Sequence, residues 1–189
     1  MPEEIPEKDK IQYADDDTEP VRLLLRLRIP SLIIGLLLGI VLSFVTSKFA
    51  GVLAKNIAIA FFIPFVVYMA AAVGTQTQSI YVRDLKTGKA NFKKYLLKES
   101  ALGFILGLIL ALVTALVILL WFKSVELALA VSLAIFGAVF TAPLIALIVA
   151  EILELEHNDP AVGAGPIATV IQDTVSILIY GFIATAIIL

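Results

Sequence analysis

The sequence predicts an all-α integral membrane protein with five transmembrane helices in each chain, and three observations lead to that class. Of its 189 residues, 60% are hydrophobic, whereas soluble domains usually contain about 45–50% apolar residues. These residues gather in long runs, and a helix needs about 20 such residues to cross a bilayer. Basic residues lie between some of the runs and are scarce between others, as in multi-pass proteins.

Five apolar segments are long enough to span a bilayer as helices. They are residues 29–47, 56–81, 99–122, 125–150 and 165–189. Because no long polar segment separates them, we expect residues 21–189 to form one transmembrane domain. Residues 1–20 are rich in Asp and Glu and poor in large apolar residues, which predicts a short disordered tail.

The segments differ in their small and acidic residues. The first contains Gly35 and Gly39 and the third Gly103 and Gly107, a four-residue spacing that we interpret as helix packing. In the second segment, Pro64 is expected to kink the helix.

The fourth segment is continuously apolar and ends just before Glu151 and Glu154. A spacing of three residues places both carboxylates on one helical face. They form either a vestibule that attracts cations or a solvated helix end.

The basic residues predict the orientation of the chain. Most lie before the first segment or between the second and third, at Arg22, Arg26, Arg28, Arg83, Lys86, Lys89, Lys93, Lys94 and Lys98. The opposite ends of the segments carry Lys48, Lys55 and Lys123. Since cytoplasmic loops have the excess of Lys and Arg, we expect a plasma-membrane protein with a cytoplasmic N-terminus and an outside C-terminus.

Several classes of function are excluded by composition. The chain has no cysteine and a single histidine, His157, so thiolate sites, zinc sites and His-based catalysis are not expected. A second intramembrane acid for an aspartyl dyad is also missing, and we expect no enzymatic activity. No basic groove interleaved with aromatic residues points to nucleic acid, which leaves membrane lipid as the expected surroundings.

The fifth segment carries one acidic residue, Asp173, deep within its apolar sequence. A charge near the bilayer centre costs about 2.5–3.5 kcal/mol on insertion scales, so such residues usually mark a functional path. At 100° per residue, Asp173 shares a polar face with Pro166, Thr169, Ser176 and Tyr180. The opposite, lipid-compatible face contains Ala168, Ile171, Val175 and Leu178.

A matching polar stretch, GTQTQS, runs from Gly74 to Ser79 at the end of the second segment. At 1.5 Å per residue, Gly74 lies about 13 Å and Asp173 about 12 Å from the ends of their segments. We therefore expect Gly74, Gln76 and Asp173 at one level, with Thr169 beside them, as the wall of an ion path. The alternative is a structural Asp173, hydrogen-bonded to Gln76 or to a threonine.

The residue types predict the class of ion. Carboxylate, hydroxyl and amide oxygens are hard ligands that suit Mg²⁺, Ca²⁺ or Mn²⁺. One embedded acid cannot replace the waters of a divalent ion, and Mg²⁺ gives up its waters reluctantly. A hydrated Mg²⁺ is therefore expected, and a symmetric dimer would place two Asp173 carboxylates around it.

Two stretches of the sequence resemble the membrane domain of the MgtE family of magnesium channels and transporters. Residues 60–88, AFFIPFVVYMAAAVGTQTQSIYVRDLKTG, are similar to the family's second transmembrane helix, with its Ile-Pro and Gly-x-Gln elements. Residues 158–173, NDPAVGAGPIATVIQD, are similar to the Asp-Pro-Ala start of its last helix. Asp173 follows Asp159 at the spacing expected for the pore aspartate, and the likeness covers roughly residues 27–189.

The resemblance implies a homodimer with an ion path along the dimer axis, lined by the second and fifth helices. It implies that Asp173 is the central acid of a magnesium site that recognises a hydrated ion. It further implies that Asp159, near the cytoplasmic mouth, binds another ion.

The sequence also departs from the family pattern. Residues 70–73, Ala-Ala-Ala-Val, replace the Gly-Gly-Asn run that often precedes Gly-x-Gln, so a broader carrier of Mn²⁺ or Co²⁺ is an alternative. About twenty residues precede the first segment, too few for the cytoplasmic CBS domains of many bacterial members. A separate regulatory or sister subunit would then control transport. An alternative of another class is a non-transporting membrane scaffold.

Overall fold

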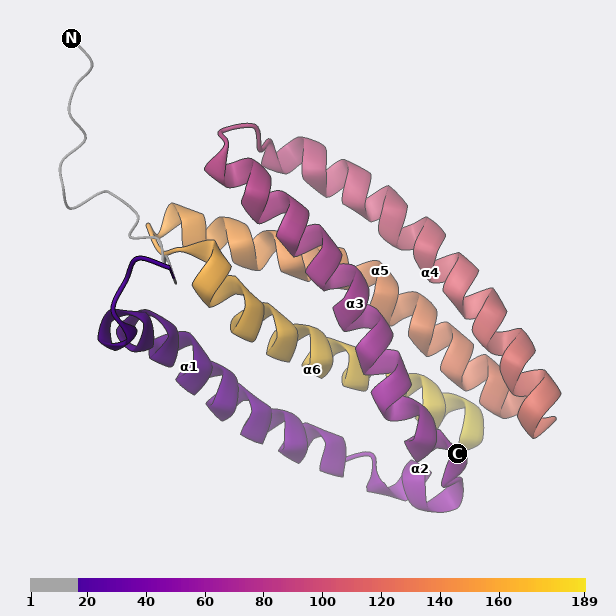
Figure 1. Ribbon diagram of the computed structural model, residues 1–189. Coiled ribbons are helices and arrows are strands. Elements are labelled where there is room, and N and C mark those ends of the chain that lie inside the picture. The colour runs from indigo at the N-terminus through magenta and orange to yellow at the C-terminus, as the bar shows by residue number, and fades with distance from the viewer. Residues whose placement is uncertain (1–16) are drawn as a thin grey trace, which may run out of the picture.

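The computed structural model describes residues 17–189 (Figure 1). The predicted disordered tail falls on residues 1–20 and therefore lies outside the described residues except at its end. The described part consists of helices α1 (Val21–Ser47), α2 (Ala50–Lys55), α3 (Ala58–Lys86), α4 (Phe92–Phe122), α5 (Val125–Leu155) and α6 (Pro160–Ile188). All except α2 are long and apolar enough to cross a membrane. The all-α class and the five predicted spans are thereby confirmed.

The helices extend beyond the predicted apolar segments. α1 begins at Val21, α4 at Phe92 and α6 at Pro160, each several residues before the corresponding apolar run. In α1 and α4 the apolar criterion stops at charged residues, but Arg and Lys are good helix formers and continue the helix. Side-chain caps set two of these starts, since Asn91 accepts a hydrogen bond from Lys94 N and Asp159 accepts one from Ala161 N.

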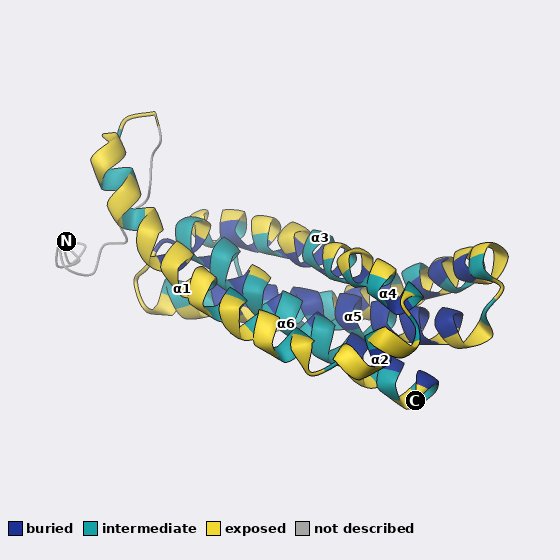
Figure 2. Cartoon of the chain, turned by 90° about the horizontal axis from the view of Figure 1, so that it is seen from below, coloured by how far each residue is buried: buried dark blue, intermediate teal, exposed yellow. Residues whose placement is uncertain are grey.

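Helix α5 lies at the centre of the bundle, with α3, α4 and α6 packed against it. Figure 2 shows its dark, buried surface between the more exposed helices. The buried residues of α5 include a series of small side chains at Ala128, Ala130, Ala134, Ala138, Ala142, Ala146 and Ala150. Small side chains let helix backbones approach closely inside a membrane, where no hydrophobic force draws helices together.

Helix α1 lies at the edge of the bundle and packs against α6 (Figures 1 and 2). Most of its surface is exposed, including Leu36 and Phe44, which suits contact with lipid. The packing interpretation holds for its Gly35, where an added Cβ would lie 3.7 Å from Pro166 of α6. It does not hold for Gly39 within the described residues, since an added Cβ there would have nothing within 4 Å.

The second glycine pair lies in the contact between α4 and α5. An added Cβ on Gly103 would lie 3.0 Å from the Phe140 carbonyl oxygen, and one on Gly107 would lie 3.0 Å from that of Phe136. Both glycines are buried. The predicted packing role of Gly103 and Gly107 is confirmed.

Candidate functional site

Asp173 lies near the middle of α6, the helix that runs from Pro160 to Ile188. At 1.5 Å per residue, it is about 20 Å from the first residue of the helix. The apolar segment had placed it nearer the end, because Pro160 to Ala164 continue the helix before Gly165. The carboxylate is thus central in its helix.

The Asp173 side chain is half-buried, and its Oδ1 atom is buried without a hydrogen-bond partner among residues 17–189. A buried acceptor with no partner costs roughly 1–3 kcal/mol, and a charged one costs more. The alternative of a structural Asp173 bonded to Gln76 or a threonine is wrong for this oxygen. Gln76 is on the exposed side of α3.

The neighbouring residue, Gln172, points into the bundle and is only 3% exposed. Its Nε2 donates a hydrogen bond of 2.9 Å to the carbonyl oxygen of Ala142 in α5. The same amide lies against Gly74 of α3, where any Cβ would overlap it. Gly74 and the Gln172–Asp173 pair therefore meet at one level, as the two predicted depths required. Sequence reasoning missed Gln172, although an uncharged polar residue beside the intramembrane acid was a usable signal.

The polar stretch of α3 divides between the inside and the outside of the bundle. Thr77 is buried, and its Oγ1 donates a hydrogen bond of 2.7 Å to Glu99 of α4. Thr75, Gln76 and Ser79 are exposed. The stretch therefore does not line a single surface, because a helix turns consecutive residues to different sides.

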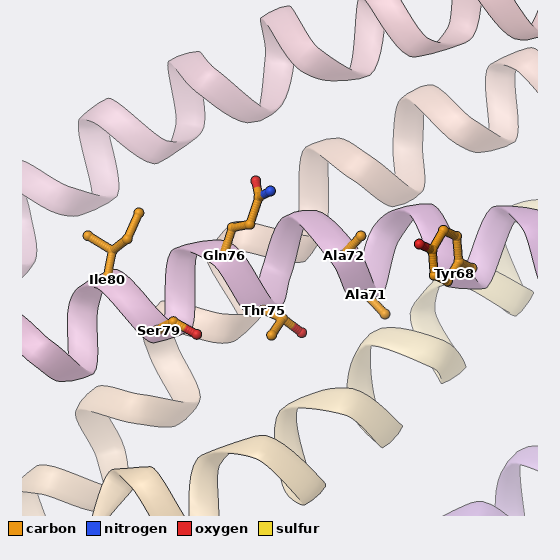
Figure 3. Close-up of a pocket in the computed structure, with 7 residues that line it drawn as sticks. All are labelled: Tyr68, Ala71, Ala72, Thr75, Gln76, Ser79 and Ile80. Carbon is orange, nitrogen blue, oxygen red and sulfur yellow. The ribbon is translucent and has the colours of Figure 1, made fainter.

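The exposed part of α3 forms a shallow groove of about 650 Å³. Its lining residues are Tyr68, Ala71, Ala72, Thr75, Gln76, Ser79 and Ile80, all from α3 (Figure 3). In this view Gln76 and Thr75 leave the helix on opposite sides. The groove combines small, polar and apolar side chains on a surface that no other described helix covers.

Thr169 is exposed and lies four residues, about one helical turn, before Asp173. Because of this spacing, the two side chains are neighbours on the surface of α6. Ser176 and Tyr180 were predicted to share this face but are buried in the bundle. The Tyr180 hydroxyl donates a hydrogen bond of 2.8 Å to the Ile59 carbonyl oxygen. Ala168, expected to face lipid, is also buried.

The physical reason is the path of the buried row along α6. Every fourth residue is buried, at Ala164, Ala168, Gln172, Ser176, Tyr180, Ala184 and Ile188. A row of such spacing slants around the helix, because four residues exceed one turn of 3.6. Residues that share a face by angle alone therefore separate into buried and exposed positions along the length of α6.

Asp159 occupies a different place, at the first turn of α6. It is buried, and its Oδ1 accepts a hydrogen bond of 2.9 Å from Ala161 N as the N-cap of the helix. It also lines a pocket of about 500 Å³ between the start of α6, the end of α5 and α1. Glu156 and Arg26 line the same pocket. The structure does not bring Asp159 and Asp173 together.

One of the two acids near the end of α5 forms a hydrogen bond to a neighbouring helix. Glu151 accepts a hydrogen bond from the Tyr81 hydroxyl of α3. This bond makes Glu151 part of the contact between α3 and α5, beyond the vestibule or solvated end that its sequence position predicted.

The acids do not gather into a metal cluster. Within residues 17–189, no three His, Cys, Asp or Glu side chains lie close enough to hold a metal ion. A fully dehydrated divalent ion needs six or more oxygen ligands, which Asp173 of one chain cannot supply.

Comparison with known proteins agrees with these features. Residues 63–183 match the model of the MgtE family, described as divalent cation transporter. The matched range contains Gly74, Gln76, Asp159, Thr169 and Asp173. The chain is also 30% identical, over 162 residues, to a protein of Bacillus subtilis (strain 168) named magnesium transporter MgtE. The alignment covers 84% of this chain and 36% of that relative, so the chain corresponds to the smaller part of it.

Proposed function

Because the chain belongs to the MgtE family of divalent cation transporters, we propose that it carries hydrated Mg²⁺ across the membrane. Its five membrane-length helices and its family make it a multi-pass protein of the plasma membrane. The observation that carries the proposal is the buried, unpaired Oδ1 of Asp173 in the middle of α6. An acid at that place is costly unless it interacts with a passing cation or its waters.

The proposed path runs at the axis of a homodimer, between α3 and α6 of two chains. The uncovered groove on α3 and the exposed Thr169 on α6 support this placement, since both leave polar side chains without a covering helix. A two-fold axis would bring the same residues from each chain together. Two Asp173 carboxylates would then balance the charge of one divalent ion.

Recognition in this proposal acts through water. Mg²⁺ usually keeps several waters in protein sites, and those waters donate hydrogen bonds to carboxylate, hydroxyl and amide oxygens. Asp173, Thr169 and Gln76 supply these three types of acceptor. Gly74 belongs to the site because it lets α3 approach α6 at the level of the acid.

The direction of the chain and the role of Asp159 complete the proposal. The basic residues favour a cytoplasmic N-terminus, which puts the start of α6 on the cytoplasmic side and the C-terminus outside. Asp159 would then lie at the cytoplasmic mouth and contact a further Mg²⁺, in addition to capping α6.

A second candidate is a carrier of several divalent ions. The family description names divalent cations in general, and residues 70–73 supply no side-chain amide for contact with the waters of the ion. Competition by Mn²⁺ and Co²⁺ distinguishes this candidate from a magnesium-selective pore.

The test is Mg²⁺ flux into proteoliposomes for the parent chain, Asp173→Asn and Asp173→Ala. Glu126→Gln is the matched control, because Glu126 is an exposed acid at the start of α5. We expect flux in the parent chain and the control, and loss of at least about tenfold in both Asp173 variants, which corresponds to about 1.4 kcal/mol. Full flux in Asp173→Asn would contradict the proposed role, and no flux in the parent chain under any gradient would favour a scaffold.

A further inference from the structure

The side chain of Gln172 joins three helices at the level of the intramembrane acid. It extends from α6, donates a hydrogen bond from its amide to the Ala142 carbonyl oxygen of α5, and lies against Gly74 of α3. A buried amide without a partner would be costly, so this contact strongly favours one position of Gln172. The bond therefore restricts how α6 can rotate against α5.

Gly74 is the residue that gives the Gln172 amide its place. A Cβ built on Gly74 overlaps the Nε2 atom, and it also lies 2.7 Å from Cδ and 2.9 Å from Oε1. By contrast, Gly39 in α1 has nothing within 4 Å of its added Cβ. Alanine at position 74 would push the amide away from Ala142 or separate α3 from α6.

Asp173 depends on this arrangement for its own position. Its Oδ1 has no hydrogen-bond partner among residues 17–189, so the carboxylate is not held by a bond at that atom. When a helix rotates as a rigid body, all of its residues turn through the same angle. A rotation of α6 that frees Gln172 therefore also swings Asp173. Gln172, the residue next to Asp173, therefore holds α6 in place at this level.

We propose that Gln172 is a positioning residue: locked between Ala142 and Gly74, it fixes the rotation of α6 and thereby the place at which Asp173 meets the ion. The consequence for transport rests on the proposed function, whereas the effect on the position of residue 173 does not. Gln172 touches neither the ion nor its waters, because it is buried on the side of α6 that faces α3 and α5.

The first test compares the Mg²⁺ concentration for half-maximal flux among variants. Gln172→Met keeps the size of the side chain but removes the hydrogen-bond donor. Gly74→Ala keeps the Gln172 amide but fills the space that this amide occupies. We expect both to raise the half-maximal concentration about fivefold, the effect of losing one net hydrogen bond of about 1 kcal/mol. The double variant Gly74→Ala/Gln172→Ala should raise it no further than the single variants, because both substitutions disrupt the same contact.

Two control variants separate positioning from general destabilisation. Tyr81→Phe removes a hydrogen bond between α3 and α5 without touching α6, and Gly39→Ala adds a methyl group in open space. Both should keep the half-maximal concentration of the parent chain, even where Tyr81→Phe lowers the melting temperature. If Tyr81→Phe raised the half-maximal Mg²⁺ concentration as much as Gln172→Met, loosening of the bundle would explain the effect and the proposal would be wrong.

The second test reads the position of residue 173 without transport. The natural chain has no cysteine, so Asp173→Cys provides a single thiol whose reaction rate with a charged, water-soluble reagent can be measured. We expect Gln172→Met to change this rate beyond replicate scatter. The rate at Lys89→Cys, an exposed position in the loop between α3 and α4, should stay the same.

The outcomes distinguish the inference from the proposed function. A changed rate at position 173, together with no flux in the parent chain, would support the positioning role and contradict the proposed transport. An unchanged rate, with flux intact in Gln172→Met, would overturn the positioning role and leave transport in place. If Gln172→Met does not fold, Gly74→Ala and its double variant with Gln172→Ala give the same comparison.

Discussion

Most buried polar side chains within the membrane-length helices have a partner, and Asp173 stands out against them. Donor and acceptor pairs link neighbouring helices at Thr77–Glu99, Tyr81–Glu151, Gln172–Ala142 and Tyr180–Ile59. Polar groups inside a membrane are costly without such bonds. The unpaired Oδ1 of Asp173 is therefore a better indicator of function than the mere presence of a polar residue.

At Asp159, substitutions can separate helix capping from charge. Asp159→Asn keeps a side-chain oxygen for Ala161 N and should change the melting temperature little. Asp159→Ala should cost about 1 kcal/mol, or about 2–4 °C for a chain of this size. Thermal unfolding in detergent measures both. Equal losses in the two variants would show that the charge, and not the cap, stabilises α6.

At the scale of the helices, the contact between α4 and α5 depends on close backbone approach. A Cβ on Gly103 would lie 3.0 Å from the Phe140 carbonyl oxygen and 3.1 Å from the Pro143 ring. Neither atom belongs to a flexible side chain that can move aside. The helices must separate to admit a larger residue, and overpacking of this kind typically costs about 1–3 kcal/mol.

Gly103→Ala is therefore expected to lower the melting temperature by several degrees, whereas Gly39→Ala should not lower it. The apparent affinity for Mg²⁺ should stay near that of the parent chain, since α4 contacts neither Asp173 nor Gln172 through any bond in the described residues. Thermal unfolding and flux are measured on the same preparations. A melting temperature unchanged by Gly103→Ala would contradict the close packing of α4 on α5.

The contact of α3 with α5 includes the bond from Tyr81 to Glu151. Tyr81→Phe leaves the carboxylate without this donor, and we expect a loss of about 1–3 kcal/mol. The double variant Tyr81→Phe/Glu151→Gln should lose less than the sum of the single variants, because the bond is absent in both. Additive losses in thermal unfolding would mean that the two side chains act independently.

At the scale of the whole molecule, the orientation of the bundle can be tested with introduced cysteines. The positive-inside rule places Lys89 in the cytoplasm and Lys123 outside. In intact cells, Lys123→Cys should react with an impermeant thiol reagent, and Lys89→Cys should react only after permeabilisation. The reverse pattern would put the start of α6 and Asp159 outside.

The proposed dimer makes a prediction of its own. A mixed dimer of one parent chain and one Asp173→Asn chain, isolated with two different affinity tags, has half of the charge at the axis. We expect its flux to fall well below the mean of the two pure dimers, because one carboxylate does not balance a divalent ion. Flux equal to that mean would indicate two independent paths, one in each chain.

The sequence by itself determined the membrane class, the number of spans and the family, because these depend on local composition and short motifs. Apolar runs of membrane length define a span wherever it packs, and the family match rests on residues along α3 to α6. It also singled out Asp173 as an unusual acid, since the cost of burying a charge holds in any arrangement of helices.

Only the tertiary structure decided which polar residues face one another. Thr77, Ser176 and Tyr180 are polar in sequence but buried against neighbouring helices. Gln172 lies beside Gly74 because α3 and α6 cross at that level. These contacts depend on how each helix is rotated and inclined in the bundle, and the periodicity of one helix contains no information on its neighbours.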